Sequence, residues 1–222
     1  MTRKNIKGLY LRVLPPEGRV VISAPLGCGD EYISRFVLTK QDFVQRAINR
    51  IIEKSGYPLE YVDGELLPFL GEHYVLQINE EVRKRPNVYL KGNSMILEIT
   101  DNSSREDRER AIYDYYCERL KNELDPLITK WEGIWGVKIS GYAFRKQKTI
   151  WGSCNRRTRH ISFNIELIKY PLGCIEYIVA QELLHILIPG HGSDFKSAMN
   201  EKLPIWRDLN ARLKMNPVQT EL

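Results

Sequence analysis

The chain has few cysteines, few histidines and no long apolar run. Its 222 residues include four cysteines, and no two of them form a C-x-x-C pair. This spacing excludes a zinc-finger or dithiol redox motif, and we expect all four thiols to be reduced packing residues. No apolar run approaches the length of a membrane span, and the basic N-terminus has no apolar signal-peptide block. We therefore expect a cytoplasmic protein without a membrane partner.

The excess of positive over negative charge is also small. The chain has 33 Lys and Arg against 28 Asp and Glu, which gives a net charge of +5, and the two signs are mostly interleaved. This balance permits a nucleic acid partner but supports one only weakly. The length is enough for one well-buried core, and we find no internal repeat. No feature of the sequence indicates an oligomeric state.

Residues 1–102 predict an N-terminal β-rich module with one helix. Two alternating apolar runs meet at the turn Pro15–Gly18, which is typical of a hairpin. Asp30 is placed to cap a helix that continues to about residue 54. Two further hairpins are predicted, with turns at Asp63–Gly64 and Gly92–Asn93.

Residues 103–222 predict an α+β domain, and the boundary falls in the polar stretch DNSSRED. A long helix is predicted to begin at Ser103 or Ser104 and to run to about Trp131. Pro126, within this range, is expected to end or kink it. Two short strands, VKISGYAFR and RHISFNIEL, follow. A helix over about 172–187 is then ended by Pro189–Gly190.

This last helix carries the motif that suggests chemistry, YIVAQELLHILIPGH from Tyr177 to His191. Residues three and four apart share a helix face, so Gln181, Glu182 and His185 lie together. In an H-E-x-x-H helix the two histidines bind zinc and the glutamate activates water. Here His185 takes the second ligand position, Glu182 the base position, and His191 emerges after the helix stop as a further ligand. Chance proximity of two histidines in an apolar helix stays open on spacing alone.

A wider set of residues resembles the YgjP-like zinc metallopeptidases, which are related to the SprT and WLM metallopeptidases. The features are a W-G-S-C loop, a strand ending in Asn, a Pro before the helix, a partial H-E-L-x-H, a His before a Phe, and a P-x-W-R segment. In this chain they are Trp151–Cys154, Asn164, Pro171, Glu182–Leu183 with His185, His191 with Phe195, and Pro204–Arg207. N-terminal segments such as VVISAP also match, so the resemblance spans nearly the whole chain.

The resemblance implies a zincin-like metallopeptidase domain, with a mixed sheet over the metal-binding helix, a bound zinc and hydrolysis of peptide or protein substrates. It implies Glu182 as the general base. We also expect the strand RHISFN to form the rim of the cleft, where an extended peptide adds as a further strand. Trp151 and Cys154 are expected to pack the loop beneath the site.

Gln181 departs from the family pattern, which has histidine at this position. An amide oxygen is neutral, less basic than imidazole and rare in zinc sites. Three interpretations are open: a weakened zinc site formed by His185, His191 and Gln181, an inactive pseudo-peptidase that binds peptides, or a substitution peculiar to this chain on an active scaffold. His160, Glu166 and Glu176 are alternative ligands only if strand and helix geometry coincide. We favour a zinc peptidase impaired by Gln181, with a peptide-binding module as the alternative and a DNA-associated factor third.

Overall fold

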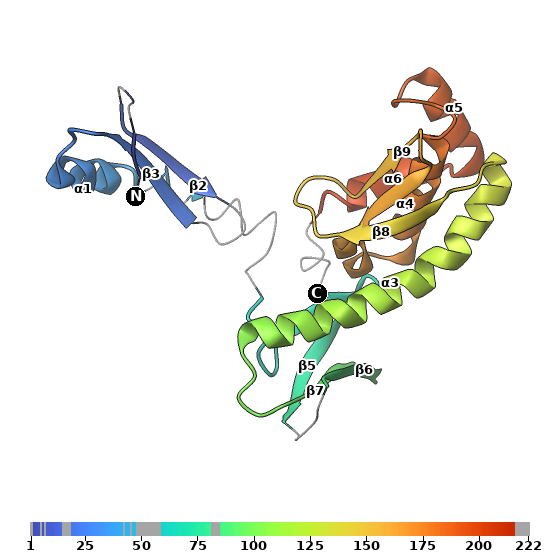
Figure 1. Ribbon diagram of the computed structural model, residues 1–222, viewed down its shortest axis with the longest axis horizontal. Coiled ribbons are helices and arrows are strands. Elements are labelled where there is room, and N and C mark those ends of the chain that lie inside the picture. Colours follow the sequence, from blue (N-terminus) through green and yellow to red (C-terminus); the bar gives the residue numbers. More distant parts are fainter. Residues whose placement is uncertain are drawn as a thin grey trace. The chain divides into compact units, whose positions relative to one another are not determined.

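The computed structural model describes residues 2–4, 6, 8–14, 19–41, 43–44, 46–47, 59–80 and 85–215. These residues cluster into two compact units, Met1–Leu59 and Glu60–Leu222 (Figure 1). The predicted domain boundary at residue 102 falls inside the second unit, and the independence of 103–222 stays a prediction.

The first unit has a three-stranded sheet and a helix. Strand β3 (Arg19–Pro25) lies between β1 (Thr2–Lys4), which is parallel to it, and β2 (Tyr10–Leu14), which is antiparallel. Helix α1 (Asp30–Thr39) follows, with Gly29 rather than Asp30 at the N-cap. The predicted turn at Pro15–Gly18 and the predicted helix beyond residue 47 lie outside the described residues.

The second unit begins with a four-stranded sheet in the order β4-β5-β7-β6. Strands β4 (Leu66–Phe69) and β5 (Glu72–Glu80) form one hairpin, and β6 (Asn87–Lys91) and β7 (Ser94–Ile99) form another. The turn at Gly92–Asn93 is as predicted. The other hairpin turns at residues 70–71 and not at Asp63–Gly64, because the Asp63 carboxylate accepts the backbone N–H of Ile78 and holds the earlier turn beside β5.

Helix α3 (Arg105–Trp135) joins this sheet to the rest of the unit. Ser104 caps it in a reciprocal capping box with Asp107, as the sequence predicted. The helix continues through Pro126 instead of ending there, and it is bent along its length (Figure 1). Its buried side chains recur about every four residues, which gives one apolar stripe: Ile112, Tyr116, Leu120, Leu124, Ile128 and Trp131.

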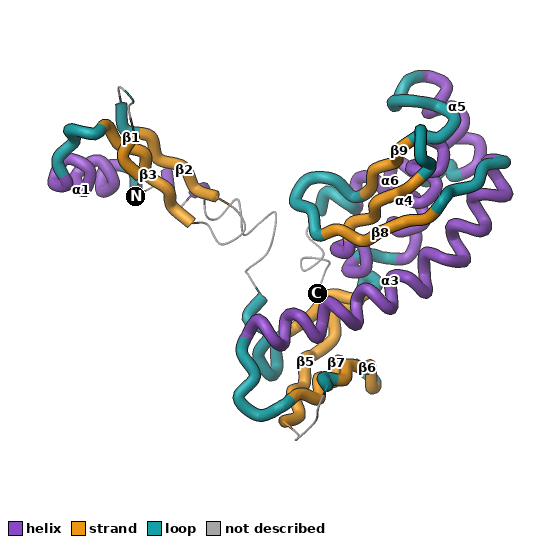
Figure 2. Tube along the Cα trace, in the orientation of Figure 1, coloured by secondary structure: helices purple, strands orange, loops and turns teal. Residues whose placement is uncertain are grey.

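A second, three-stranded sheet follows α3, and Figure 2 shows its strands beside the C-terminal helices. Its order is β8-β10-β9, with β8 (Gly141–Arg145) parallel and β9 (Gly152–Asn155) antiparallel to β10 (His160–Asn164). The expectation that RHISFN receives a peptide is therefore wrong, because β10 is paired along both edges. The edge strands are β8 and β9.

Three α-helices and a 3-10 helix complete the unit. They are η1 (Ile165–Lys169), α4 (Leu172–Leu184), α5 (Ser193–Lys202) and α6 (Trp206–Arg212). Helix α4 packs against α3, α6, η1 and β9, which makes it the central helix. The chain is thus α+β, as predicted, with a mixed sheet against the helix that carries the motif. None of the described helices is both long and apolar enough to cross a membrane.

Candidate active site

Helix α4 is enclosed on nearly all sides. Nine of its thirteen residues are buried, including Ile178, Val179, Leu183 and Leu184. A helix that is apolar all round is stable only in an interior, so polar side chains on it need partners or a cleft. Gln181 and Glu182 are the residues to which this applies.

His185 ends α4, and the following turn brings His191 back beside it. The helix stops at Leu184, earlier than the predicted residue 187, and His185 is its C-cap. Gly190 adopts a φ of +77°, a left-handed conformation that glycine adopts without strain. As a result, His191 Nε2 lies 3.0 Å from His185 Nε2.

The surroundings of His185 direct the lone pair of one ring nitrogen toward His191. Nδ1 lies 3.2 Å from the carbonyl oxygen of Ile188, so Nδ1–H donates to it and Nε2 keeps a lone pair. Burial lowers the pKa of His185, which favours this neutral form. The ring of Phe195 packs on both imidazoles, with centroid distances of 5.2 Å to His185 and 4.6 Å to His191.

Glu182 is a buried carboxyl group on the same helix. Glu182 is 2% exposed, and this burial raises its pKa to about 7. A hydrogen bond from Gln181 Nε2 to Glu182 Oε1, at 3.1 Å, acts to lower the pKa. Gly152 leaves room for it: a methyl group at that position would lie 2.7 Å from Glu182 Cγ. A carboxyl group that titrates near neutrality is suited to both accept and release a proton.

The Gln181 amide is held between two neighbours. Its Oε1 accepts a hydrogen bond from the Tyr177 hydroxyl at 2.7 Å, and its Nε2 donates to Glu182. The Tyr177 ring in turn stacks on Trp206 at a centroid distance of 6.2 Å. Gln181 therefore links Tyr177 to Glu182 in a chain of hydrogen bonds.

His185 and His191 are suited to be two of the ligands of one divalent metal ion. Two imidazole nitrogens on one tetrahedral zinc lie roughly 3.4 Å apart, since each Zn–N bond is about 2.0–2.1 Å, and the pair here is close to that spacing. Among the described residues, no three His, Cys, Asp or Glu side chains gather closely enough to hold an ion. The third protein ligand would have to be Gln181 Oε1, a neutral oxygen that already accepts a hydrogen bond. These residues fit a weakly held zinc.

The four predicted site residues line one cavity of about 540 Å³. Its walls come from the segment before β9, from β9 itself, and from α4, α5 and α6. Beyond Gln181, Glu182, His185 and His191, they include Ile150, Trp151, Gly152, Ser153, Cys154, Tyr177, Ile178, Phe195, Trp206 and Asn210. Burial raises the pKa of Cys154. Its thiol therefore stays protonated, which agrees with a packing role.

None of the alternative ligands lines this cavity. His160 begins β10, where it pairs with Gly141 and Asn155. Glu166 forms an ion pair with Lys169, and Glu176 accepts from Lys130 and Trp131. The bridging role of Tyr177 was not predicted, although its position four residues before Gln181 places both on one helix face.

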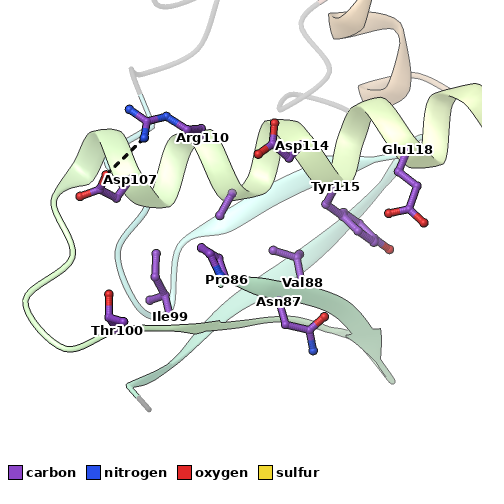
Figure 3. Close-up of a pocket in the computed structure, with 11 residues that line it drawn as sticks. Pro86, Asn87, Val88, Ile99, Thr100, Asp107, Arg110, Asp114, Tyr115 and Glu118 are labelled. Carbon is purple, nitrogen blue, oxygen red and sulfur yellow. Dashed lines mark ion pairs between the residues drawn. The ribbon is translucent and has the colours of Figure 1, made fainter. Parts of the chain in front are cut away.

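A second cavity, of about 430 Å³, lies between α3 and the strands β6 and β7 (Figure 3). Three carboxylates of α3 line it, those of Asp107, Asp114 and Glu118, and Asp107 pairs with Arg110 at 3.7 Å. It contains none of the predicted site residues.

Comparison with known proteins gives the family. A family model described as the YgjP-like metallopeptidase domain matches residues 7–216. The chain belongs to the YgjP-like family. Because the match covers both units, the N-terminal unit is part of what this YgjP-like protein shares with its family. The family is one of metallopeptidases, which gives a peptidase scaffold that uses a metal.

Solved structures add only distant similarity to this YgjP-like protein. The zymogen of Pyrococcus abyssi abylysin is 17% identical, with 40% of this chain and 90% of that chain covered and a TM-score of 0.37. The zymogen of Methanocaldococcus jannaschii jannalysin is 14% identical, with 41% and 87% covered and a TM-score of 0.37. The search of curated proteins gave no match.

Proposed function

We propose that this YgjP-like protein is a cytoplasmic, zinc-dependent peptidase whose metal affinity is reduced by Gln181. The observation that carries the proposal is the approach of His185 and His191 to 3.0 Å, in the same cavity as the buried carboxyl of Glu182. His185, His191 and Gln181 would hold the zinc. When bound, zinc supplies a Lewis acid that polarises the scissile carbonyl and acidifies a water.

Glu182 moves the proton in this mechanism. Its Oε1 accepts from Gln181, which leaves Oε2 to take the proton from the attacking water. Glu182 then passes that proton to the leaving amine, a role to which a pKa of about 7 is matched. The Gln181 hydrogen bond orients the carboxyl group during both transfers.

The substrate would be a peptide or protein whose main chain lies along β9. This strand has β10 on one side only, and Gly152, Ser153 and Cys154 line the cavity. An edge strand offers unpaired N–H and C=O groups to an extended chain, and this arrangement replaces the predicted addition at β10.

A catalytically inactive peptide-binding module is the second candidate. It is favoured by the hydrogen-bond chain from Tyr177 through Gln181 to Glu182, which satisfies the polar atoms without a metal. Both candidates bind a peptide, and they differ in whether zinc binds tightly enough for catalysis.

Replacing Gln181 by histidine tests the proposal. Gln181→His supplies a third imidazole, so we expect zinc affinity to rise at least ~10-fold, the lower end of the effect of even an indirect change at a zinc site. Zinc affinity is measured by competition with a chromophoric chelator, and cleavage of a quenched casein substrate reports activity.

The control is Gln181→His combined with Glu182→Gln, which should keep the zinc and lose the cleavage. Stoichiometric zinc without cleavage in Gln181→His would favour the binding module. Unchanged zinc affinity would refute the ligand set itself.

A further inference from the structure

The segment around the edge strand β9 carries positive charge and contains no acidic residue of its own. Residues 138–165 contain seven Lys and Arg and no Asp or Glu. Two of the seven are paired with carboxylates elsewhere, Lys138 with Glu132 at 2.5 Å and Lys146 with Glu109 at 2.7 Å. The other five are all exposed: Arg145, Lys148, Arg156, Arg157 and Arg159. None of these five forms an ion pair with a carboxylate in the described parts of the chain.

The fold separates these five cations into two groups at opposite ends of β9. Arg145 is the β8 residue opposite Asn164 in the sheet, at the end of β10 that lies beside the start of β9. Lys148 lies in the connection from β8 to β9. Arg156, Arg157 and Arg159 lie in the turn from β9 to β10. Figures 1 and 2 show this connection and this turn at opposite ends of the sheet. Arg156 is also anchored beside the motif, since its Nη2 lies 3.5 Å from the carbonyl oxygen of Ile186.

The cavity lies between the two cationic ends. Gly152, Ser153 and Cys154 of β9 line it, and no Lys or Arg is among the described residues that do. Ile150, Trp151 and Trp206 give its walls an apolar and aromatic part, beside the polar side chains of the site. A chain lying along β9 would therefore meet positive charge, then a cavity without Lys or Arg that is partly apolar, then positive charge again.

We propose that the substrate of this site is an acidic peptide segment, in which Asp or Glu residues flank a short apolar stretch. The proposal rests on the proposed function for the location of the cleft and adds the class of sequence that enters it. Four residues of β9 span roughly 13 Å, so the acidic residues would lie about four to six positions apart. Charge complementarity at the rim would steer and orient such a segment, while the apolar and aromatic side chains of the cavity contact its centre.

A peptide fits this surface better than a nucleic acid does. The cations are separated by an edge strand, whose N–H and C=O groups pair with a peptide main chain and have no equivalent partner in a sugar-phosphate backbone. A groove for single-stranded nucleic acid would instead be expected to carry a continuous run of cations along the strand's path.

Binding of three matched peptides tests the proposal. Ten-residue rhodamine-labelled peptides would share one apolar centre and differ only in flanks of Glu, Gln or Lys. Fluorescence anisotropy with the full chain is expected to show the Glu peptide bound roughly 10-fold more tightly than the Gln peptide, with the Lys peptide weakest. The difference should shrink as salt is raised, because exposed charges are screened.

Charge-reversal variants locate the effect on the surface. Lys148→Glu and Arg157→Glu lie at the two ends of β9, and each is expected to weaken the Glu peptide about 3–5-fold, the scale of one exposed ion pair. Lys91→Glu changes the net charge equally on β6 of the other sheet and should leave binding unchanged. Equal weakening by all three variants would reduce the effect to overall charge and overturn the proposal.

The remaining outcomes separate this proposal from the proposed function. Equal affinity for the Glu and Gln peptides would overturn it, even where Gln181→His cleaves both. Selective binding of the Glu peptide without cleavage by Gln181→His would support it and reject the peptidase. A single-stranded oligonucleotide that binds more tightly than the Glu peptide and displaces it would overturn it in favour of a nucleic acid surface.

Discussion

At the scale of single residues, the site is organised around the Gln181 amide. A histidine at this position would present one nitrogen to a metal, whereas the amide both accepts from Tyr177 and donates to Glu182. In the mechanism that we propose, the same side chain therefore weakens the ligand set and orients the base. In that mechanism, a single substitution at position 181 changes both metal binding and the orientation of Glu182, because an amide has both a donor and an acceptor.

Gly152 is the residue whose small size matters most to Glu182. A methyl group there would lie 2.7 Å from Cγ and 2.9 Å from Cδ of Glu182. Since the clash is with a side chain that can rotate, Gly152→Ala should displace the carboxyl group and leave the fold nearly unchanged. In the Gln181→His background we expect kcat to fall about 100-fold, the usual effect of a displacement near 1 Å, as measured with a quenched peptide.

The control for this prediction is Gly133→Ala in α3, where a methyl group has no neighbour within 4 Å. It should retain activity and stabilise the helix by up to about 1 kcal/mol. Full activity in Gly152→Ala would mean that Glu182 does not act from its observed position.

At the scale of elements, the β4–β5 hairpin is fitted to the start of α4. Gly71 in its turn has a φ of +86°, and a methyl group at that position would lie 2.7 Å from Cγ and 3.1 Å from Cα of Pro171. The neighbouring Leu70 N–H donates to the carbonyl oxygen of Ile168 at 2.7 Å. The turn thus connects the four-stranded sheet to the segment that leads into the active-site helix.

Gly71→Ala should therefore destabilise the second unit by two mechanisms, the left-handed backbone and the contact with Pro171. We expect a loss of about 2–4 kcal/mol in the free energy of unfolding, measured by urea denaturation. Gly64→Ala is the matched control, since φ is +83° but no atom lies within 4 Å of the added methyl group. It should cost about 1 kcal/mol. Equal losses in the two variants would show that the contact with Pro171 contributes nothing.

At the scale of the whole second unit, a buried polar cluster connects α3 with η1. Glu166 accepts the Tyr113 hydroxyl and pairs with Lys169 at 2.6 Å. Burial alone would raise the pKa of Glu166, but Lys169 and the hydrogen bond from Tyr113 outweigh it, and the pKa lies below the usual 4.5. The ionised form is thus the one that stabilises the fold.

This cluster gives an expected pH dependence of stability. A carboxyl group whose pKa is lowered by folding stabilises the protein above its unfolded pKa, and that contribution is lost as the pH falls through the folded pKa. The free energy of unfolding should therefore fall on acidification below about pH 4.5, and Glu166→Gln should flatten this decrease. Urea denaturation at several pH values measures it.

Glu166→Gln should also lower stability at pH 7 by about 3–5 kcal/mol, since it leaves Lys169 buried without its partner. The control is Glu72→Gln, at an exposed position of β5, which should retain the acid dependence of the natural chain. An unchanged acid dependence in Glu166→Gln would show that other carboxyl groups determine it.

Much of the local structure followed from the sequence. The N-cap at Ser104 and the hairpin turn at Gly92–Asn93 depend on backbone preferences and on hydrogen bonds within a few residues. The motif around Glu182 likewise placed Gln181, Glu182 and His185 on one face through helix periodicity. Local rules failed at Pro126, because the contacts of α3 with two layers of the unit stabilise the helix beyond the residue that would end an isolated one.

The sequence by itself determined the family and the α+β class, and it predicted the candidate metal ligands, because these depend on residue order and short-range geometry. Only the tertiary structure decided that β10 is central and β9 is an edge strand, that Gly152 leaves room for Glu182, and that Tyr177 holds the Gln181 amide. Only it brought the cations of two connections to opposite ends of one strand. These features depend on strand pairing and packing between segments distant along the chain, and such contacts leave no local pattern from which to predict them.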